Sequence, residues 1–131
     1  MSLQIDHLIL RVGDARASVQ FYRQMLGLRH EGQAAPFEVL RVDAGCTIDL
    51  LEAPPRDPAH LAFSMDRPAF DAIRARLEAG GIPYGGQPFA PDSKVGVQQG
   101  ARGPADALYF FDPDRHNIEI RTYDIRPYDE R

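Results

Sequence analysis

The chain has 131 residues, enough for a single domain with its own hydrophobic core. Its formal net charge of -4 at pH 7 comes from interspersed acidic and basic residues, so we expect neither a nucleic-acid partner nor a membrane partner. The single cysteine excludes an internal disulfide. We find no leader pattern and no long apolar run, and therefore expect a cytoplasmic protein.

The first half of the chain begins with a strand pattern followed by a helix pattern. In "HLILRV", which starts at His7, residues alternate with a period of two, which is typical of a half-buried strand. Asp14 is a suitable N-cap for the helix that follows, and Gly27 is placed to end it. The runs "FEVLRVDAG" and "CTIDLLEA" then predict two further strands.

The second half repeats this order. "HLAFSM", which starts at His60, predicts a strand, Asp66 and Pro68 open a helix, and Gly80 and Gly81 end it. "ALYFFD" and "NIEIRTYD" predict the closing strands. We therefore predict one domain, 1–131, built from two modules in tandem. Its parts are module one at about 4–53, a Pro-rich connector at 54–58, module two at about 59–124 and a polar tail at 125–131.

A long Gly- and Pro-rich segment separates the second helix from "ALYFFD". Loops of this length often act as lids, and part of this one is expected to form an additional strand. Its glycines lack the spacing of a nucleotide-binding loop.

Potential metal ligands fall at matching positions of the two modules. Because side chains alternate across a strand, the residues that do not face the helix share the opposite face of the sheet. The potential metal ligands expected there are His7, Asp49, His60 and Glu119. Two histidines and a carboxylate form the set used for non-haem iron, and similar sets bind zinc. Three protein ligands also leave positions open for water or substrate.

The motifs "DHLILRVGDARASVQFYRQMLGL", "HLAF" and "YFFDPDRHNIEI" resemble the vicinal oxygen chelate superfamily, which includes glyoxalase I, extradiol dioxygenases and the fosfomycin- and bleomycin-resistance proteins. The resemblance covers residues 4–123. It implies an α+β fold of paired βαβββ modules, whose cupped mixed sheet carries its helices on the outer face. It also implies one divalent metal per cup, either Fe, Ni, Zn, Co or Mn, and a homodimer that often shares its cups between chains.

By this resemblance His7, His60 and Glu119 occupy the three metal-ligand positions. Asp49 stands where glyoxalase I has a fourth, glutamate ligand, and its shorter side chain acts either through water or as a base. The fosfomycin-resistance proteins are similar at Tyr109. However, Ile9 replaces the threonine of the members that use thiols, and their lysine-bearing loop is not recognisable.

The sequence thus favours a metal-dependent enzyme acting on a small substrate with vicinal oxygens. Lyase or isomerase chemistry through an enediolate-like species leads, with Glu119 or Asp49 moving a proton and Tyr109 donating a hydrogen bond. Three arginines could bind an anionic substrate: Arg102, Arg11 and Arg121. A short ring-cleaving dioxygenase is the first alternative, and a metal-free protein that binds a drug or metabolite is an alternative of another class.

Overall fold

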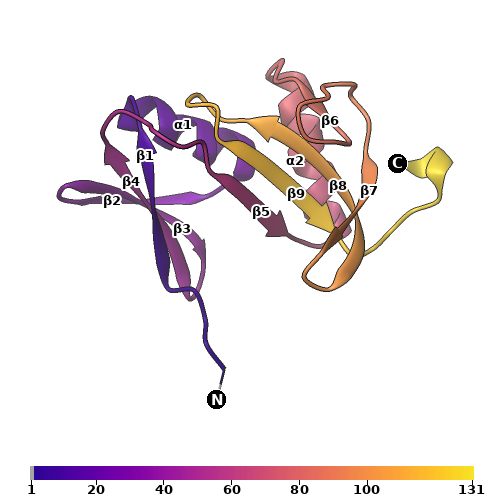
Figure 1. Ribbon diagram of the computed structural model, residues 1–131, viewed down its shortest axis with the longest axis horizontal. Helices are drawn as coiled ribbons and strands as arrows, with labels where there is room; N and C mark the ends of the chain where they lie inside the picture. The colour runs from indigo at the N-terminus through magenta and orange to yellow at the C-terminus, as the bar shows by residue number, and fades with distance from the viewer. Residues whose placement is uncertain (1) are drawn as a thin grey trace. The chain divides into compact units, whose positions relative to one another are not determined.

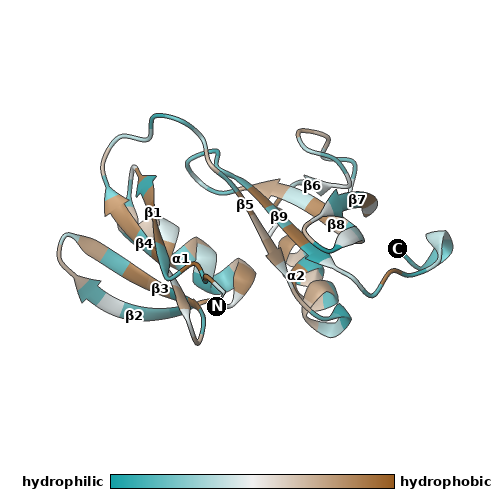
Figure 2. Cartoon of the chain, turned by 60° about the horizontal axis from the view of Figure 1, so that its bottom comes forward, coloured by the Kyte–Doolittle hydropathy of each residue, from teal (hydrophilic) through white to brown (hydrophobic). Residues whose placement is uncertain are grey.

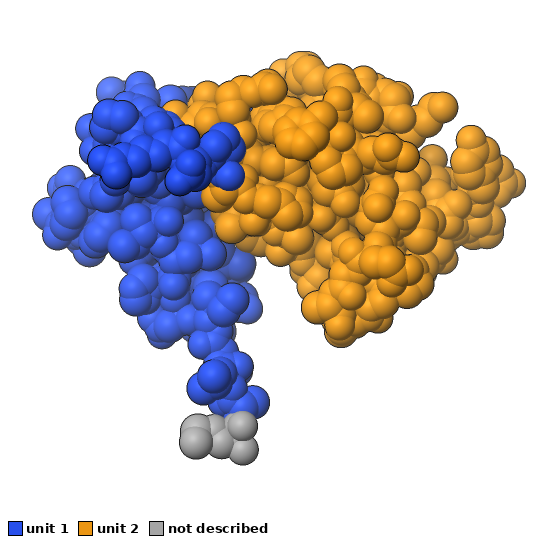
Figure 3. All heavy atoms as spheres, viewed as in Figure 1, with its two compact units in different colours: residues 1–58 blue, residues 59–131 orange. Residues whose placement is uncertain are grey.

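The chain forms two compact units that divide between Pro58 and Ala59 (Figure 3). The computed structural model describes residues 2–131. Unit 1 contains β1 (His7–Val12), α1 (Ala15–Leu26), β2 (Arg29–Ala34), β3 (Phe37–Asp43) and β4 (Cys46–Glu52). Unit 2 contains β5 (His60–Ser64), α2 (Arg67–Ala79), β6 (Tyr84–Gly85), β7 (Gly96–Gly100), β8 (Gly103–Phe111), β9 (Asn117–Thr122) and a 3₁₀ turn at Tyr128–Glu130.

Unit 1 is a four-stranded mixed sheet with one helix against it (Figure 1). The strand order is β1-β4-β3-β2, in which β1 and β4 are parallel and the other pairs are antiparallel. The residues buried beneath α1 alternate along the strands, as the period-two pattern predicts. They are Leu10, Val12, Leu40, Ile48 and Leu50. The alternate residues, including His7 and Asp49, therefore lie on the face away from the helix.

The ends of α1 follow from its capping residues. Asp14 has an extended backbone, and its Oδ1 accepts a hydrogen bond from the Ala17 N–H at 3.1 Å. Gly27 ends the helix with φ 71°, a left-handed conformation that costs glycine little. Both capping predictions are confirmed.

Unit 2 repeats this topology with strand order β5-β9-β8-β6, and β7 pairs with the same edge of β8 (Figure 1). β6 pairs with Tyr109 and Phe110 near the C-terminal end of β8, whereas β7 pairs with residues 103–107 at its N-terminal end. The two short strands together take the position that β2 has in unit 1. The long segment thus supplies a strand, as expected, in two pieces.

Helix α2 covers one face of the second sheet. Asp66 caps it by accepting from the Ala69 N–H at 3.0 Å, and its apolar residues Phe70, Ile73 and Leu77 are buried. On β9, Ile118 and Ile120 are also buried. Hydrophobic residues are visible along β4 and β9 in Figure 2. The predicted α+β fold with two modules is confirmed.

Two features depart from a plain reading of the sequence. The strand β2, "RHEGQA", carries no apolar alternation, so the residue pattern does not predict it, although the βαβββ order implied by the resemblance does; its pairing with β3 holds it in place. Arg115 takes the position where a turn favours glycine, and it adopts that left-handed conformation with φ 67°. Neither α1 nor α2 has the length and apolar composition that crossing a membrane requires.

Candidate metal and substrate site

In unit 2, three adjacent strands place His60, Tyr109 and Glu119 on one face of the sheet. Tyr109 pairs directly with Glu119 across β8 and β9, and His60 of β5 pairs with Asn117, two residues before Glu119. Residues two apart in a strand share a face, so all these side chains lie on the side away from α2. The register of the strands thus places these residues on the shared face of the sheet that the sequence predicts, and their roles stay predictions.

The hydrogen bonds of His60 define which ring nitrogen is available as a ligand. Its Nδ1 lies 3.1 Å from the backbone oxygen of Asn117, which can only accept, so Nδ1 carries a hydrogen. In a neutral ring Nε2 then bears a lone pair, and it lies 3.2 Å from Oε1 of Glu119. A lone pair and a carboxylate repel each other unless a cation, either a proton or a metal ion, is shared between them.

The Glu119 carboxylate contacts His60, Arg121 and Tyr109. Its side chain is only 6% exposed, Arg121 Nη1 donates to Oε2 at 2.6 Å, and the Tyr109 hydroxyl donates a further hydrogen bond. Burial and the neighbouring Glu119 charge raise the pKa of Tyr109 to about 12, so its hydroxyl remains a donor at neutral pH. These contacts leave Oε1 as the carboxylate oxygen that faces His60.

In unit 1, His7 and Asp49 are related by strand register in the same way as His60 and Glu119 in unit 2. His7 pairs with Thr47 in the parallel strand β4, and Asp49 lies two residues beyond on the same face. His7 Nδ1 lies 2.7 Å from Oδ2 of Asp6, and this hydrogen bond raises the pKa of His7. Asp49 Oδ1 accepts from the Thr47 hydroxyl at 3.0 Å. Asp6 is not among the residues predicted from the sequence, although an acidic residue next to a candidate ligand is a usable signal.

The residues present fit a divalent metal. Both His7 and His60 use Nδ1 to reach an acceptor, which is the usual arrangement of metal-binding histidines and leaves Nε2 as the ligand. Ligand bonds of about 2.0–2.2 Å at about 90–110° imply about 2.8–3.6 Å between neighbouring ligand atoms. The His60 Nε2 to Glu119 Oε1 distance of 3.2 Å lies in that range. Among residues 2–131, no three such side chains already form a group that could hold a metal.

The three arginines have different environments. Arg11 Nε donates to the Pro54 carbonyl at 3.0 Å. Arg102 lies 4.2 Å above the Tyr123 ring, and its Nη2 reaches the Ser64 hydroxyl at 3.3 Å. Arg121 is buried, and besides Glu119 its terminal nitrogens donate to backbone carbonyls of residues 98, 99 and 103. These contacts make Arg121 an orienting partner of Glu119; substrate binding by any of the three stays a prediction.

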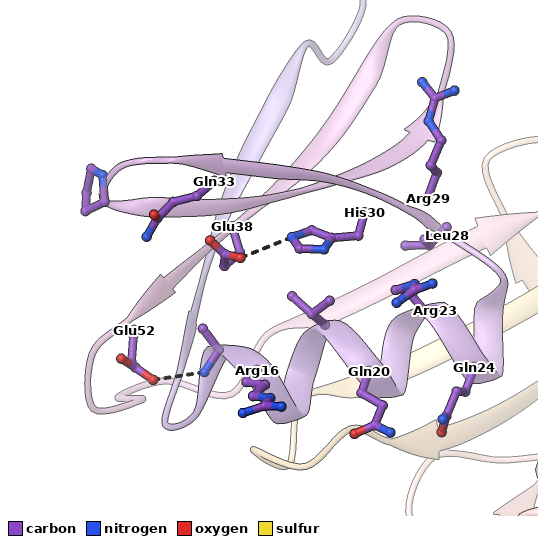
Figure 4. Close-up of a pocket in the computed structure, with 13 residues that line it drawn as sticks. Arg16, Gln20, Arg23, Gln24, Leu28, Arg29, His30, Gln33, Glu38 and Glu52 are labelled. Atoms are coloured by element: carbon purple, nitrogen blue, oxygen red, sulfur yellow. Dashed lines mark hydrogen bonds and ion pairs between the residues drawn. The ribbon is translucent and has the colours of Figure 1, made fainter.

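A cavity of about 1040 Å³ in unit 1 lies on the opposite side of its sheet, between α1 and the strands β2 and β3 (Figure 4). Its lining includes His30, which pairs with Glu38 at 3.1 Å, and Glu52, which accepts from the Ala15 N–H. None of the residues singled out by the sequence lines it. We therefore assign no function to this cavity.

A sequence profile of the Glyoxalase/Bleomycin resistance protein/Dioxygenase superfamily matches residues 4–120. The chain belongs to this superfamily. The resemblance noted from the sequence motifs is thereby confirmed, and it extends over almost the whole chain.

Several proteins that are similar to this chain have names that state an activity. The solved structure of oxidase ChaP-H2 is 32% identical, with a TM-score of 0.82 and coverage of 98% of this chain and 97% of that one. Oxidase ChaP-H1 is 30% identical with a TM-score of 0.77, covering 97% and 98%. The glutathione transferase FosA of Serratia marcescens is 29% identical over 129 residues, which are 93% of this chain and 82% of that protein. These relatives are enzymes, which bears out the leaning toward an enzyme.

Proposed function

We propose that the protein is a divalent-metal-dependent enzyme that uses dioxygen to oxidise a small substrate with two adjacent oxygen atoms. The observation that carries the proposal is the His60–Glu119 pair, in which the imidazole Nε2 and the carboxylate Oε1 lie 3.2 Å apart. The similarity to two oxidases at 30% identity or more supports oxidative chemistry. It moves the dioxygenase reading ahead of the lyase or isomerase reading that the sequence favours.

In this proposal His7, His60 and Glu119 hold the metal, which is iron for chemistry with dioxygen. When bound, the metal supplies a Lewis acid that makes the deprotonated form of a vicinal diol accessible at neutral pH. Arg121 fixes the Glu119 carboxylate through its hydrogen bond of 2.6 Å. The Tyr109 hydroxyl donates to the same carboxylate. Asp49, on the face of His7, accepts the substrate proton.

The proposed reaction is balanced by dioxygen alone. One carbon–carbon bond next to the diol breaks, both oxygen atoms enter the product, and no external reductant is needed. The proposed substrate is a small molecule. The homodimer and the cytoplasmic location remain predictions, and sedimentation velocity would test the homodimer.

The test is dioxygen uptake by the iron-loaded protein with catechol and 2,3-dihydroxynaphthalene. We expect uptake of one mole of dioxygen per mole of ring-opened product. His60→Gln should abolish it, whereas His30→Gln, a histidine on the other face of the first sheet, should retain it. No uptake with either substrate would contradict the oxidative assignment.

A second candidate, proton transfer as in a lyase or isomerase, is favoured by Asp49, whose carboxylate lies near His7 on the same face of unit 1. It predicts turnover of the hemithioacetal of methylglyoxal and glutathione without dioxygen uptake. Absence of metal binding altogether would instead favour the metal-free binding protein.

A further inference from the structure

His116 is a buried histidine of unit 2 that the proposed function does not use. It lies in the turn between β8 and β9 and is only 2% exposed. Its Nδ1 accepts a hydrogen bond from the Ala59 N–H at 2.8 Å, so in a neutral ring the hydrogen is on Nε2. Ala59 directly precedes His60 in the chain. A side chain 57 residues away therefore contacts the backbone that leads into the proposed metal ligand.

Both polar backbone groups of Ala59 are bound by consecutive residues of this turn. The N–H donates to His116, and the carbonyl accepts from the Asn117 N–H at 2.8 Å. Asn117 is also the residue opposite His60 in the register of β5 and β9, and its carbonyl accepts from His60 Nδ1 at 3.1 Å. The backbone of Asn117 makes these contacts, since its side-chain Nδ2 has no hydrogen-bond partner among residues 2–131. Ala59 thus cannot shift along β9 without breaking its hydrogen bond to His116.

Packing alone does not fix the position of His60. It is the first residue of β5, which is an edge strand of its sheet and pairs with β9. Its side chain is 51% exposed. Strand ends with exposed hydrogen bonds open at a small cost in free energy. The orientation of the His60 ring therefore depends on the hydrogen bonds at the start of β5.

The turn that carries His116 is closed by its own hydrogen bonds. Asp112 Oδ1 accepts from the N–H groups of Asp114 and His116, both at 2.9 Å. The Asp112 N–H donates to the His116 carbonyl at 3.1 Å, and its carbonyl accepts from the Arg115 N–H at 3.1 Å. The guanidinium carbon of Arg115 lies 4.0 Å from the centre of the Phe111 ring, a cation–π contact. The imidazole is therefore presented from a backbone that is already ordered.

We propose that His116 is a positioning residue of the metal site, which orients His60 through the Ala59 N–H. This inference rests on the proposed function, because it takes His60 as a metal ligand. A metal-binding histidine is normally oriented by an acceptor at its other ring nitrogen. Here that acceptor is the Asn117 carbonyl, and His116 keeps Ala59 and His60 in register with it. His60 Nε2 is thereby held 3.2 Å from Glu119 Oε1, a distance that fits a shared metal ion.

Two substitutions distinguish hydrogen bonding by His116 from packing. His116→Asn is smaller than the native residue, but its Oδ1 can take the place of Nδ1 as the acceptor. His116→Leu fills the space better and cannot accept a hydrogen bond. The measurement is the Kd for Zn²⁺, obtained by competition with a chromogenic chelator.

We expect His116→Leu to raise the Kd for Zn²⁺ about 10-fold, the lower end of the effect of residues that orient a ligand directly. His116→Asn should raise it less than about 3-fold, since the acceptor is kept. Weaker binding in His116→Asn than in His116→Leu would show that His116 only fills space. That result, or a wild-type Kd in His116→Leu, would overturn the proposal.

Asp106→Asn controls for a general loss of stability. Asp106 pairs with Thr122, the last residue of β9, whereas His116 precedes the first residue of that strand. Each Kd is measured well below the Tm of the variant, so that every protein is folded. Asp106→Asn should then bind Zn²⁺ like wild type. An equal rise of the Kd in Asp106→Asn and His116→Leu would contradict a specific role of His116.

A second readout requires neither metal nor activity. Long-range ¹H–¹⁵N NMR spectra of chelator-treated protein show which ring nitrogen of each histidine carries the hydrogen, in alkaline buffer where imidazole is neutral. In wild type we expect the hydrogen on Nε2 of His116 and on Nδ1 of His60. His60 should lose this single form in His116→Leu and keep it in His116→Asn.

The two readouts separate failure of this inference from failure of the proposed function. If wild type binds Zn²⁺ and His60 keeps its hydrogen on Nδ1 in His116→Leu, the positioning role is refuted and the proposed function stands. If wild type binds no metal ion, the proposed function fails, and the NMR spectra alone decide whether His116 orients His60.

Discussion

Asp106 offers a test of how the second unit is stabilised. It lies on β8 and is fully buried, with its two carboxylate oxygens shared among three donors. Arg67 Nη1 donates at 2.7 Å, Arg131 Nε at 2.8 Å and the backbone N–H of Arg126 at 3.1 Å. Arg67 is itself only 5% exposed, so Asp106→Asn would leave a buried guanidinium without its main counter-charge.

Breaking a buried ion pair by removing one partner costs about 3–5 kcal/mol. Because the asparagine oxygen can still accept one hydrogen bond, we expect a loss near the lower end, about 3 kcal/mol of the free energy of unfolding. For a chain of this length this corresponds to a decrease in Tm of roughly 10 °C. Thermal unfolding followed by circular dichroism at pH 7 measures it.

Asp71→Asn is the matched control, because Asp71 pairs with the same arginine at 3.1 Å but is 56% exposed. An exposed pair contributes less than about 1 kcal/mol, so this variant should lose at most a few degrees. Equal losses in Asp71→Asn and Asp106→Asn, or a change below about 2 °C in Asp106→Asn, would refute the reasoning from burial.

The effect of Asp106 also has a defined pH dependence. Burial by itself raises the pKa of this carboxyl, but the hydrogen bonds from Arg131, the Arg126 backbone and Arg67 outweigh burial and hold the pKa below the ordinary value of an aspartate. A lowered pKa in the folded state means that the contribution is complete above the unfolded value and is lost as the pH falls through the folded one. The difference in Tm between wild type and Asp106→Asn should therefore stay constant from pH 7 to about 4 and become smaller below that pH.

Three further predictions concern unit 1. Asp14→Ala removes the N-cap of α1 and should cost about 1 kcal/mol in urea unfolding; an unchanged midpoint would show that the cap is not formed in solution. Gly27→Ala forces a side chain into φ 71° and should also cost about 1 kcal/mol, so a stabilised variant would contradict the left-handed end of α1. Hydrogen bonds from Arg41 and Arg29 lower the pKa of Glu31 to about 2, so the stability that Glu31 contributes persists until the pH falls toward that value. NMR titration of Glu31 should give a midpoint of about 2 in wild type and a midpoint closer to 4.5 in Arg41→Gln. A wild-type midpoint near 4.5 would exclude the hydrogen bonds of Glu31 with the two arginines.

Residue patterns predicted most of what is local in this fold. The alternation in "HLILRV" and "HLAF" gives β1 and β5, and the capping residues Asp14 and Asp66 mark where both helices begin. The same alternation correctly placed the histidines and carboxylates on the faces away from the helices within each unit. These features depend on residues that are close in the sequence, so the sequence alone is enough to predict them.

Other features depend on pairing between distant residues. β2 is an exposed edge strand with no buried side, so it carries no apolar period and is specified by its register with β3. Nothing in the local sequence predicts that Arg121 is buried, yet backbone carbonyls of β7 and β8 accept hydrogen bonds from its guanidinium. The ring orientation of His60 and the unpartnered amide of Asn117 likewise follow from contacts that no local pattern encodes.

The most direct test of the proposed metal-dependent function is metal content. Elemental analysis of untagged protein, purified without added metal, should give near one equivalent of a divalent metal, with iron expected. His7→Ala, His60→Ala and Glu119→Ala should each lose it, while His30→Ala should keep it. A wild type that stays empty after incubation with each candidate metal, or that keeps its metal in all three ligand variants, would contradict the account.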